Sequence, residues 1–514
     1  MTVEFELDKQ QQFSRYFNKA LAHHANNHLN LAIELYRKAL NYNPSHLPTI
    51  QVLALLFENT SQYDKALTYY KLALVKNSHS PNLHYSIASC YDACLQLNKA
   101  KYHYEQAINL RQDYAEAYNN HGNVCRKLGE YQIAEESLFR ALRLYISIET
   151  LANIGLLMAE LRKHDLALSY YNHALQIEPD NASVQWNKAL LLLSQGFWRD
   201  GWKLYDYGIM AKTRPKQISQ PDDSINDYSL DYFRDKTLFI HREQGIGDEI
   251  MFASCFRELI SVTKKCYIEA DTRLVNLFQR AFPTATIVPH SELLISSDYS
   301  NEELADIHLS SASIPRYIRN RNSDFPYTKG YLQAIPSSQS HWTSRFNALG
   351  DGVKIGISWR GGIGEQSIKR SAELQYWKKI FNHQNCQFIN LQYGHVEDEL
   401  NQFDTVIHEW IDTDHFHNIE ELAAQISALD LVITVSNITA HLAGALGKPV
   451  WIILPYAANW RWLNGKNPSV WYPSARLFCQ RTPGEWNSVF DEVSKALVKL
   501  NDSHQSPNKR LQHA

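Results

Sequence analysis

A repeat of about 34 residues constrains the N-terminal part of this chain more than any other feature. Small residues recur at separations of 34, 34, 34, 33 and 34, at Ala32, Ala66, Ala100, Ala134, Ala167 and Gly201. Four positions after each stands a bulky residue, Tyr in five of the six units, and seven positions after each stands another small residue. Positions i, i+4 and i+7 share one helix face, where small side chains let a second helix approach closely. Each unit therefore predicts two antiparallel helices.

This pattern resembles the tetratricopeptide repeat over residues 13–211, in about six units. The resemblance implies an all-α solenoid whose concave groove binds a protein. We interpret the repeated tyrosines as packing residues. The cluster His23, His24 and His28 is interpreted as a solvated helix face, because no Cys or carboxylate completes a metal site there.

Strand-like and helix-like segments alternate after a polar segment, residues 212–236, which we predict to be a linker. An apolar run at 237–241, a glycine loop and a helix at 249–261 together predict the start of a Rossmann-like α/β unit. A second unit begins with the strand 353–359. The remaining predicted strands are 266–270, 386–390, 431–435 and 450–454, and the remaining predicted helices are 372–382, 419–428, 439–446 and 485–500. Alternation of this kind predicts parallel sheets, in one domain over 237–350 and another over 351–500, with a disordered tail at 501–514.

Three motifs in this α/β region resemble a known enzyme family. HREQGIGDEIMF at 241–252 and SNITAHLAGALGKP at 436–449 are similar to the two main loops of heptosyltransferase-like glycosyltransferases. LPYAANWRWL at 454–463 resembles a bacterial group that joins tetratricopeptide repeats to such a region. The resemblance implies the GT-B fold, two Rossmann-like domains with a cleft between them. It also implies a metal-independent transferase with no cofactor, which moves a sugar from a nucleotide-sugar donor to a protein or glycan acceptor recruited by the repeats.

The donor's diphosphate is expected at the start of the helix 439–446. The segment that holds Ser436, Asn437, Thr439 and His441 lies where a strand ends and a helix begins, and free N–H groups there stabilise developing negative charge. The alternative is that Asn437 and Thr439 only cap the helix and His441 only packs. The resemblance adds the basic pair Lys369 and Arg370 as phosphate-binding residues, with a solvated loop as the alternative.

Asp248 is the residue that the resemblance implies as catalytic base, deprotonating an acceptor hydroxyl. The alternative role for Asp248 is a helix N-cap, and Glu243 and Glu249 are alternative bases. Glycines and residues of the second glycine loop are expected to form the cleft between donor and acceptor, namely Gly245, Gly247, Trp359, Arg360, Gly361 and Gly362. Arg360 adds a cation to that loop or blocks a subsite.

Two further patterns are given non-functional interpretations. Asp412-Thr413-Asp414 matches a short metal-binding pattern of another glycosyltransferase fold, and we expect no metal there because the pattern arises easily by chance. The aromatic residues Trp460, Trp462, Trp471 and Tyr472 are expected to pack in the core rather than to stack on a ligand.

Composition bears on the partners of this chain and on its environment. The formal net charge of 514 residues is −3, which gives no support for nucleic-acid binding. Seven cysteines without a CxxC pair indicate a reducing, cytoplasmic environment, and no apolar run is long enough to predict a transmembrane segment. Three hypotheses remain. The first is a glycosyltransferase, the second is a non-catalytic scaffold protein in which the repeats bind a partner and the α/β region is degenerate, and the third is a chaperone-like adaptor without a ligand.

Overall fold

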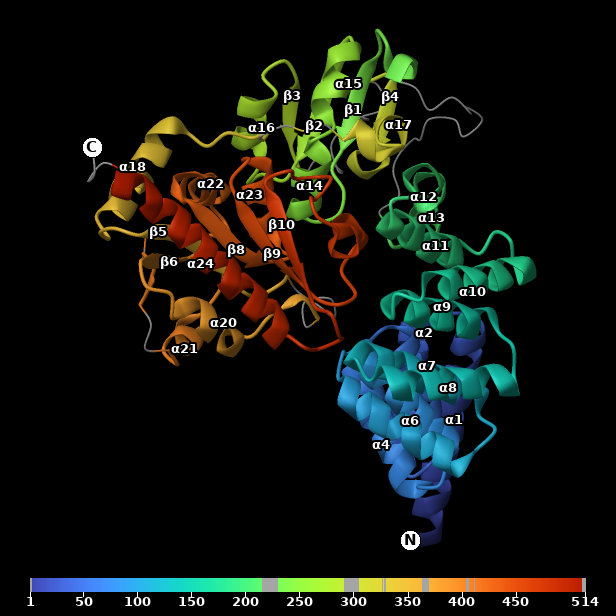
Figure 1. The fold of residues 1–514 in the computed structure, drawn as a ribbon. Coiled ribbons are helices and arrows are strands. Elements are labelled where there is room, and N and C mark those ends of the chain that lie inside the picture. The colour runs from blue at the N-terminus through green and yellow to red at the C-terminus, as the bar shows by residue number, and fades with distance from the viewer. Residues whose placement is uncertain are drawn as a thin grey trace. The chain divides into compact units, whose positions relative to one another are not determined.

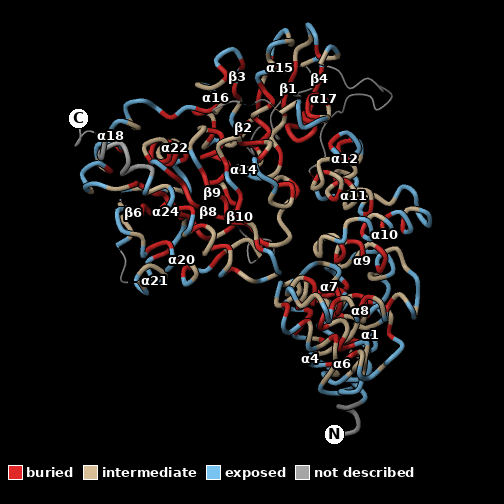
Figure 2. Tube along the Cα trace, in the orientation of Figure 1, coloured by how far each residue is buried: buried red, intermediate tan, exposed pale blue. Residues whose placement is uncertain are grey.

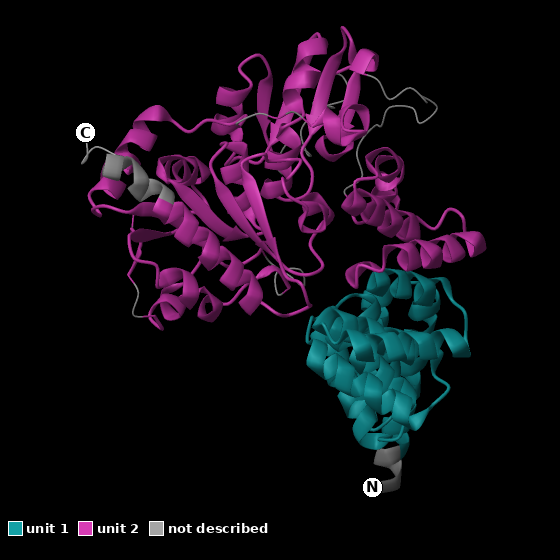
Figure 3. Ribbon diagram, in the orientation of Figure 1, with its two compact units in different colours: residues 1–158 teal, residues 159–514 magenta. Residues whose placement is uncertain are grey.

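The computed structural model describes residues 2–214, 230–290, 305–325, 327, 330–362, 369–403, 406–410 and 412–510. The chain divides into two compact units, Met1–Met158 and Ala159–Ala514 (Figure 3). This division lies inside the repeat array and not at the predicted linker 212–236, of which residues 215–229 lie outside the described part of the chain.

Unit 1 is entirely helical in the residues described (Figure 1). Consecutive helices pack in pairs, α1 with α2, α3 with α4, α5 with α6 and α7 with α8. Their bounds are α1 Thr2–Ala25, α2 Leu29–Tyr42, α3 Leu47–Asn59, α4 Tyr63–Lys76, α5 Pro81–Ala93, α6 Leu97–Leu110, α7 Ala115–Leu128, α8 Tyr131–Leu144 and α9 Ile148–Glu160, the last of which reaches into unit 2.

The small residues of the repeat lie between the paired helices, as the sequence predicts. Ala32, Ala66 and Ala100 are fully buried, and a Cβ on Gly122 would come within 2.6 Å of the Leu138 side chain. The tyrosines four positions later, Tyr36, Tyr70 and Tyr104, are buried as well. The interpretation of the tyrosines as packing residues is therefore confirmed. Their rings are buried, and a larger side chain at the small positions would collide with the facing helix.

The last helices of the array belong to unit 2. They are α10 His164–Ile177, α11 Ala182–Gln195, α12 Trp198–Tyr205 and α13 Tyr207–Met210. On α12 the indole of Trp202 donates to the Arg319 carbonyl at 2.8 Å and that of Trp198 donates to Asn322 Oδ1 at 2.7 Å. Trp202 also meets the Trp460 ring edge-on at 5.5 Å. These contacts explain why the last repeat packs with the α/β region.

A four-stranded parallel sheet with strand order β3-β2-β1-β4 follows. Its strands are β1 Thr237–His241, β2 Lys265–Ala270, β3 Thr286–Pro289 and β4 Ile307–Ser310, and its helices include α14 Ile246–Ala253, α15 Phe256–Val262, α16 Val275–Ala281 and α17 Pro315–Ile318. The predicted single helix 249–261 is two helices, because the chain bends at Ser254, whose hydroxyl donates back to the Met251 carbonyl at 2.7 Å.

The second sheet has six parallel strands in the order β10-β9-β8-β5-β6-β7. Its strands are β5 Val353–Ser358, β6 Cys386–Asn390, β7 Ile407–His408, β8 Leu431–Val435, β9 Val450–Leu454 and β10 Ala475–Cys479, and its helices are α18 Pro336–Asn347, α20 Leu374–Phe381, α21 Glu397–Leu400, α22 Ile419–Ala428, α23 Ile438–Ala445 and α24 Asn487–Arg510. The helix α24 continues past residue 500, where the sequence predicted a disordered tail. The segment has no glycine, and the Asn501 amide lies 3.4 Å from the Gln384 carbonyl.

The strands at the centre of this sheet are buried (Figure 2), and its two faces contribute to different cores. Ile433 and Ile453 point to the face covered by α20 and α24, whereas Val432 and Ile452 point to the face covered by α22 and α23. The core on the face covered by α22 and α23 is continuous with the core of the four-stranded sheet and with Trp202. Among the described helices, none combines the length and the apolar character needed to cross a bilayer.

Candidate functional site

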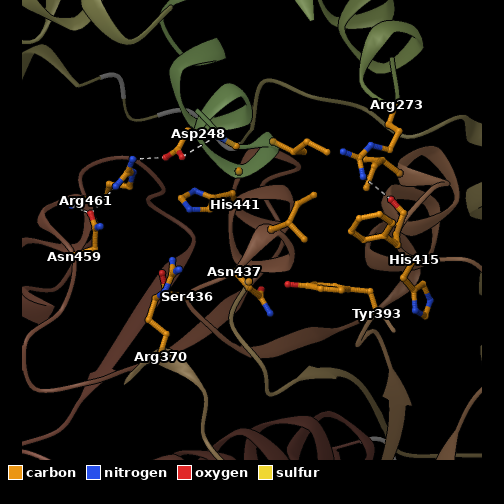
Figure 4. Close-up of a pocket in the computed structure, with 17 residues that line it drawn as sticks. Asp248, Arg273, Arg370, Tyr393, His415, Ser436, Asn437, His441, Asn459 and Arg461 are labelled. Carbon is orange, nitrogen blue, oxygen red and sulfur yellow. Dashed lines mark hydrogen bonds and ion pairs between the residues drawn. The ribbon is translucent and has the colours of Figure 1, made fainter. Parts of the chain in front are cut away.

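A cavity of about 380 Å³ opens in unit 2 where the two sheets meet (Figure 4). Residues that follow β1 and β2 line one side, namely Gly245, Ile246, Gly247, Asp248 and Arg273. Residues that follow strands of the six-stranded sheet, or that lie on its helices, line the other side, namely Gly362, Arg370, Tyr393, His415, Phe416, Ile419, Ser436, Asn437, Ile438, His441, Asn459 and Arg461. The cavity thus lies at the carboxyl ends of the strands of both sheets, where open α/β sheets bind ligands.

The first turns of α14 and α23 meet at this cavity. Asn437 caps α23, because its Oδ1 accepts from the Ala440 N–H at 3.3 Å, and its amide donates to Ser358 Oγ at 2.7 Å. On α14, Gly247 lies against His441, so that a Cβ there would come within 2.9 Å of the ring carbon Cδ2. Both the structural interpretation of Asn437 as a cap and its expected place in the cavity therefore hold.

Asp248 points into the cavity and is paired with Arg461. Its second carboxylate oxygen accepts from the Gly245 N–H at 3.4 Å, the contact expected of an acidic residue in a first helical turn. The guanidinium of Arg461 also donates to Asn459 Oδ1 at 2.7 Å and to Gln244 Oε1 at 2.8 Å. Arg461 therefore joins the loop after β9 to the loop after β1.

His441 is buried, and its Nδ1 lies 2.9 Å from the Tyr472 hydroxyl. Burial, together with Arg461 and Arg370, lowers the pKa of His441 to about 3. At neutral pH the imidazole is therefore uncharged and offers a ligand a single hydrogen bond rather than a positive charge.

Among the described lining residues, positive charge comes from three arginines, Arg273, Arg370 and Arg461. Burial, with Arg461 nearby, lowers the pKa of Arg370, although a guanidinium stays charged at neutral pH. The third arginine, Arg273, donates from its Nε to Asp271 Oδ1 at 2.8 Å. Its guanidinium also donates to the Phe416 carbonyl at 3.0 Å. Asp248 is the one acidic residue among the lining residues described.

Several predicted site residues lie elsewhere. Lys369 pairs with Glu160 at 3.0 Å and does not line the cavity. The Trp359 indole donates to Glu399 at 2.6 Å, and Arg360 pairs with the same carboxylate at 2.8 Å. Glu399 thus binds both side chains, and neither lines the cavity. The Gly361 N–H donates to Ser371, and Thr439 is fully buried beneath the cavity-lining turn. Of the second glycine loop, the cavity-lining residue described is Gly362.

The alternative bases do not line the cavity. Glu243 makes a buried ion pair with Arg214, at 2.5 Å and 2.8 Å. Burial raises the pKa of Glu249, whose carboxylate accepts from Arg242 at 2.7 Å. Asp412 pairs with Arg345, and Asp414 pairs with His417. The described residues contain no cluster suited to a metal ion. Trp460, Trp462, Trp471 and Tyr472 are all buried, as the packing interpretation predicted.

The sequence did not identify five further polar residues that line the cavity, namely Arg273, Tyr393, His415, Asn459 and Arg461. The available signal was slight. Arg461 is the one charged residue in the run Asn459-Trp460-Arg461-Trp462-Leu463, in which the three apolar side chains are buried and the arginine reaches the cavity. The buried side chains of Trp460 and Trp462 therefore fix the position of Arg461 at the cavity.

Comparisons with known proteins support the helical part. The tetratricopeptide repeat family model matches residues 13–46, 115–145 and 148–181. Protein FlbA of Caulobacter vibrioides is 26% identical over 411 residues, which are 77% of this chain and 63% of FlbA. Tetratricopeptide repeat protein 17 of Danio rerio is 31% identical over 88 residues, 17% of this chain and 7% of that protein. The chain thus spans less than two thirds of either relative.

Among solved structures, a crystal structure of MamA protein aligns with 34% of this chain and 95% of its own, at 23% identity and a TM-score of 0.31. The repeat matches agree with the helix pairs and with the small residues buried between them. The N-terminal part of this chain is therefore a tetratricopeptide-repeat solenoid, a scaffold suited to protein interaction, joined to an α/β region with two parallel sheets.

Proposed function

We propose that the α/β region is a glycosyltransferase that binds a nucleotide sugar in the cavity and transfers the sugar to a protein or glycan acceptor. The observation that carries the proposal is the composition of one cavity at the carboxyl ends of two sets of parallel strands. Among the described lining residues, it combines Arg370, Arg461 and the capped first turn of α23 with one carboxylate, Asp248. Cations and free N–H groups suit a diphosphate, and a carboxylate suits the deprotonation of a hydroxyl.

In the proposed reaction the acceptor hydroxyl gives its proton to Asp248. The acceptor oxygen forms a bond to the anomeric carbon of the sugar while the bond from that carbon to the diphosphate breaks. The nucleoside diphosphate leaves with the electron pair, and the charge that develops on it is stabilised by Arg461, Arg370 and the N–H groups of α23. His441, being neutral, contributes one hydrogen bond without adding charge.

The donor site is tested by calorimetry with UDP, GDP, dTDP, CDP and ADP. Arg370→Ala should weaken binding of the preferred nucleotide about 10- to 100-fold, the cost of a charge-assisted hydrogen bond. Lys369→Ala is the matched control: this neighbouring cation pairs with Glu160, so its loss should leave affinity within about twofold. Equal effects of both substitutions, or none of either, would contradict the site.

The catalytic assignment is tested with Asp248→Asn, which keeps the shape of the side chain and removes its basicity. Transfer, or slow donor hydrolysis where no acceptor is known, should fall about 10²- to 10⁴-fold. Unimpaired transfer by this variant would rule out Asp248 as the base. Nucleotide binding with no transfer or hydrolysis by the unmodified chain would favour the second hypothesis, a scaffold protein that binds nucleotide without catalysis.

A further inference from the structure

Arg461 is held in place before any ligand arrives. Its planar guanidinium lies 4.8 Å from the centre of the Trp460 ring, and Asn459 and Gln244 accept hydrogen bonds from its two terminal nitrogens. Its Nε is buried and has no acceptor among the described residues. A guanidinium held in place in this way is suited to an oxyanion, because little side-chain freedom is lost when the anion binds.

Asp248 occupies this guanidinium in the structure. The carboxylate reaches Arg461 from the first turn of α14, on the opposite side of the cavity (Figure 4). While the pair is made, the positive charge of Arg461 is neutralised for an incoming anion, and one oxygen of Asp248 is occupied for an incoming hydroxyl. The two functions proposed for these residues therefore exclude each other until the pair opens.

We propose that Asp248 is an internal stand-in for the diphosphate: the ligand displaces Asp248 from Arg461, and this exchange frees the carboxylate to act as base. This inference rests on the proposed function and adds a regulation to it. Donor binding must precede activation of the acceptor, so the base is not available to water in an empty site. In this scheme Arg461 binds Asp248 in the empty site and the diphosphate in the occupied site. Whether Asp248 is paired therefore depends on whether the donor is bound.

The test is a double-mutant cycle read by calorimetry with inorganic pyrophosphate and with UDP, GDP, dTDP and ADP. If Asp248 competes with the anion, Asp248→Asn should bind pyrophosphate and the preferred nucleotide about 5- to 20-fold more tightly than the unmodified chain. Arg461→Gln should weaken binding about 10- to 100-fold. In the Arg461→Gln background, Asp248→Asn should no longer tighten binding, because the group for which it competes is gone.

Asp412→Asn is the matched control. It removes the same charge from an aspartate that also pairs with an arginine, Arg345 at 3.2 Å, but that does not line the cavity. Tighter binding in this control, unchanged or weaker binding in Asp248→Asn, or a tightening that persists without Arg461 would each overturn the exchange. If Arg461→Gln does not fold, as judged by its melting curve, Arg461→Met, which also removes the positive charge, takes its place in the cycle.

The outcomes separate this inference from the proposed function. Coupled binding without sugar transfer would support the exchange and contradict the transferase. Sugar transfer without coupling would do the reverse. If neither pyrophosphate nor any nucleoside diphosphate binds the unmodified chain, both are wrong.

Discussion

Gly247 shows how a single missing side chain shapes the site. It lies in the first turn of α14, where a Cβ would come within 2.9 Å of the His441 ring. We expect Gly247→Ala to destabilise the protein by about 1–3 kcal/mol, the usual cost of adding a methyl group to a packed contact. The measurement is urea unfolding of unit 2.

Gly245→Ala is the control for this substitution. A Cβ at Gly245 meets only Asp248 Oδ2, at 3.9 Å, and the residue has an ordinary φ of −95°. The free energy of unfolding should therefore change little. Equal destabilisation by both substitutions would show that the loop, and not the contact with His441, restricts residue size.

His441 predicts a pH dependence of stability. The pKa of this residue is about 3 in the folded chain and near the ordinary histidine value of about 6.5 when unfolded, so the unfolded chain binds more protons between these values. Stability is then lost as pH falls. His441 alone should account for about 1 kcal/mol between pH 6.5 and 5.5.

Comparison of the unmodified chain with His441→Gln isolates this contribution, because the other histidines are common to both. The difference in free energy of unfolding between pH 6.5 and 5.5 should be smaller in the variant. An identical pH dependence would mean that His441 accepts a proton in the folded chain, and so would contradict its neutral state in the cavity.

At this scale the sequence predicted about half of the described residues that line the cavity. Asp248, Ser436, Asn437 and His441 were found because each follows a strand that its own apolar run identifies. The adjacent residues Lys369 and Arg370 were not distinguishable, since their directions depend on Glu160 and on the cavity. Contacts between segments distant in the chain decide such cases, and no local pattern records them.

At the scale of elements, strands buried on both faces were predicted most accurately. β1, β6, β8 and β9 coincide with the predicted ranges because they are short apolar runs between turn residues. β3, β4, β7 and β10 were missed. The four residues of β4 include His308, and β10 is an edge strand with an exposed Arg476, so neither shows a continuous apolar run.

The helix α12 carries a prediction at this scale. Trp202 is buried between Trp198, Trp460 and the Arg319 carbonyl, so Trp202→Ala should destabilise unit 2 by about 3–5 kcal/mol. Phe197→Ala, at the exposed N-cap of the same helix, should cost far less. Thermal unfolding of both variants measures the difference, and similar melting temperatures would show that α12 does not depend on this contact.

At the scale of the whole molecule, the unit boundary predicts where the chain can be divided. Residues 159–514 should fold on their own, because they keep the last repeat with the α/β region. Residues 225–514 should not. They lose Trp198 and Trp202, which cover Trp460 and Trp471, and they lose Arg214, which leaves the buried carboxylate of Glu243 without its cation. Solubility and cooperative unfolding of the two fragments are the measurements, and equal stability would place the boundary at the predicted linker after all.

If the α/β region is the proposed transferase, the repeat solenoid of unit 1 is expected to select the acceptor. The described lining residues of the cavity all belong to unit 2, so residues 159–514 should bind the preferred nucleotide with an affinity within about twofold of the whole chain. Transfer to a small hydroxyl acceptor should be retained by this fragment, whereas transfer to a macromolecular acceptor should fall at least tenfold. Residues 1–158, once circular dichroism shows them folded, should inhibit macromolecular transfer by the whole chain when added in excess, because they compete for the acceptor. Equal turnover of the macromolecular acceptor by the fragment and the whole chain would remove unit 1 from substrate selection.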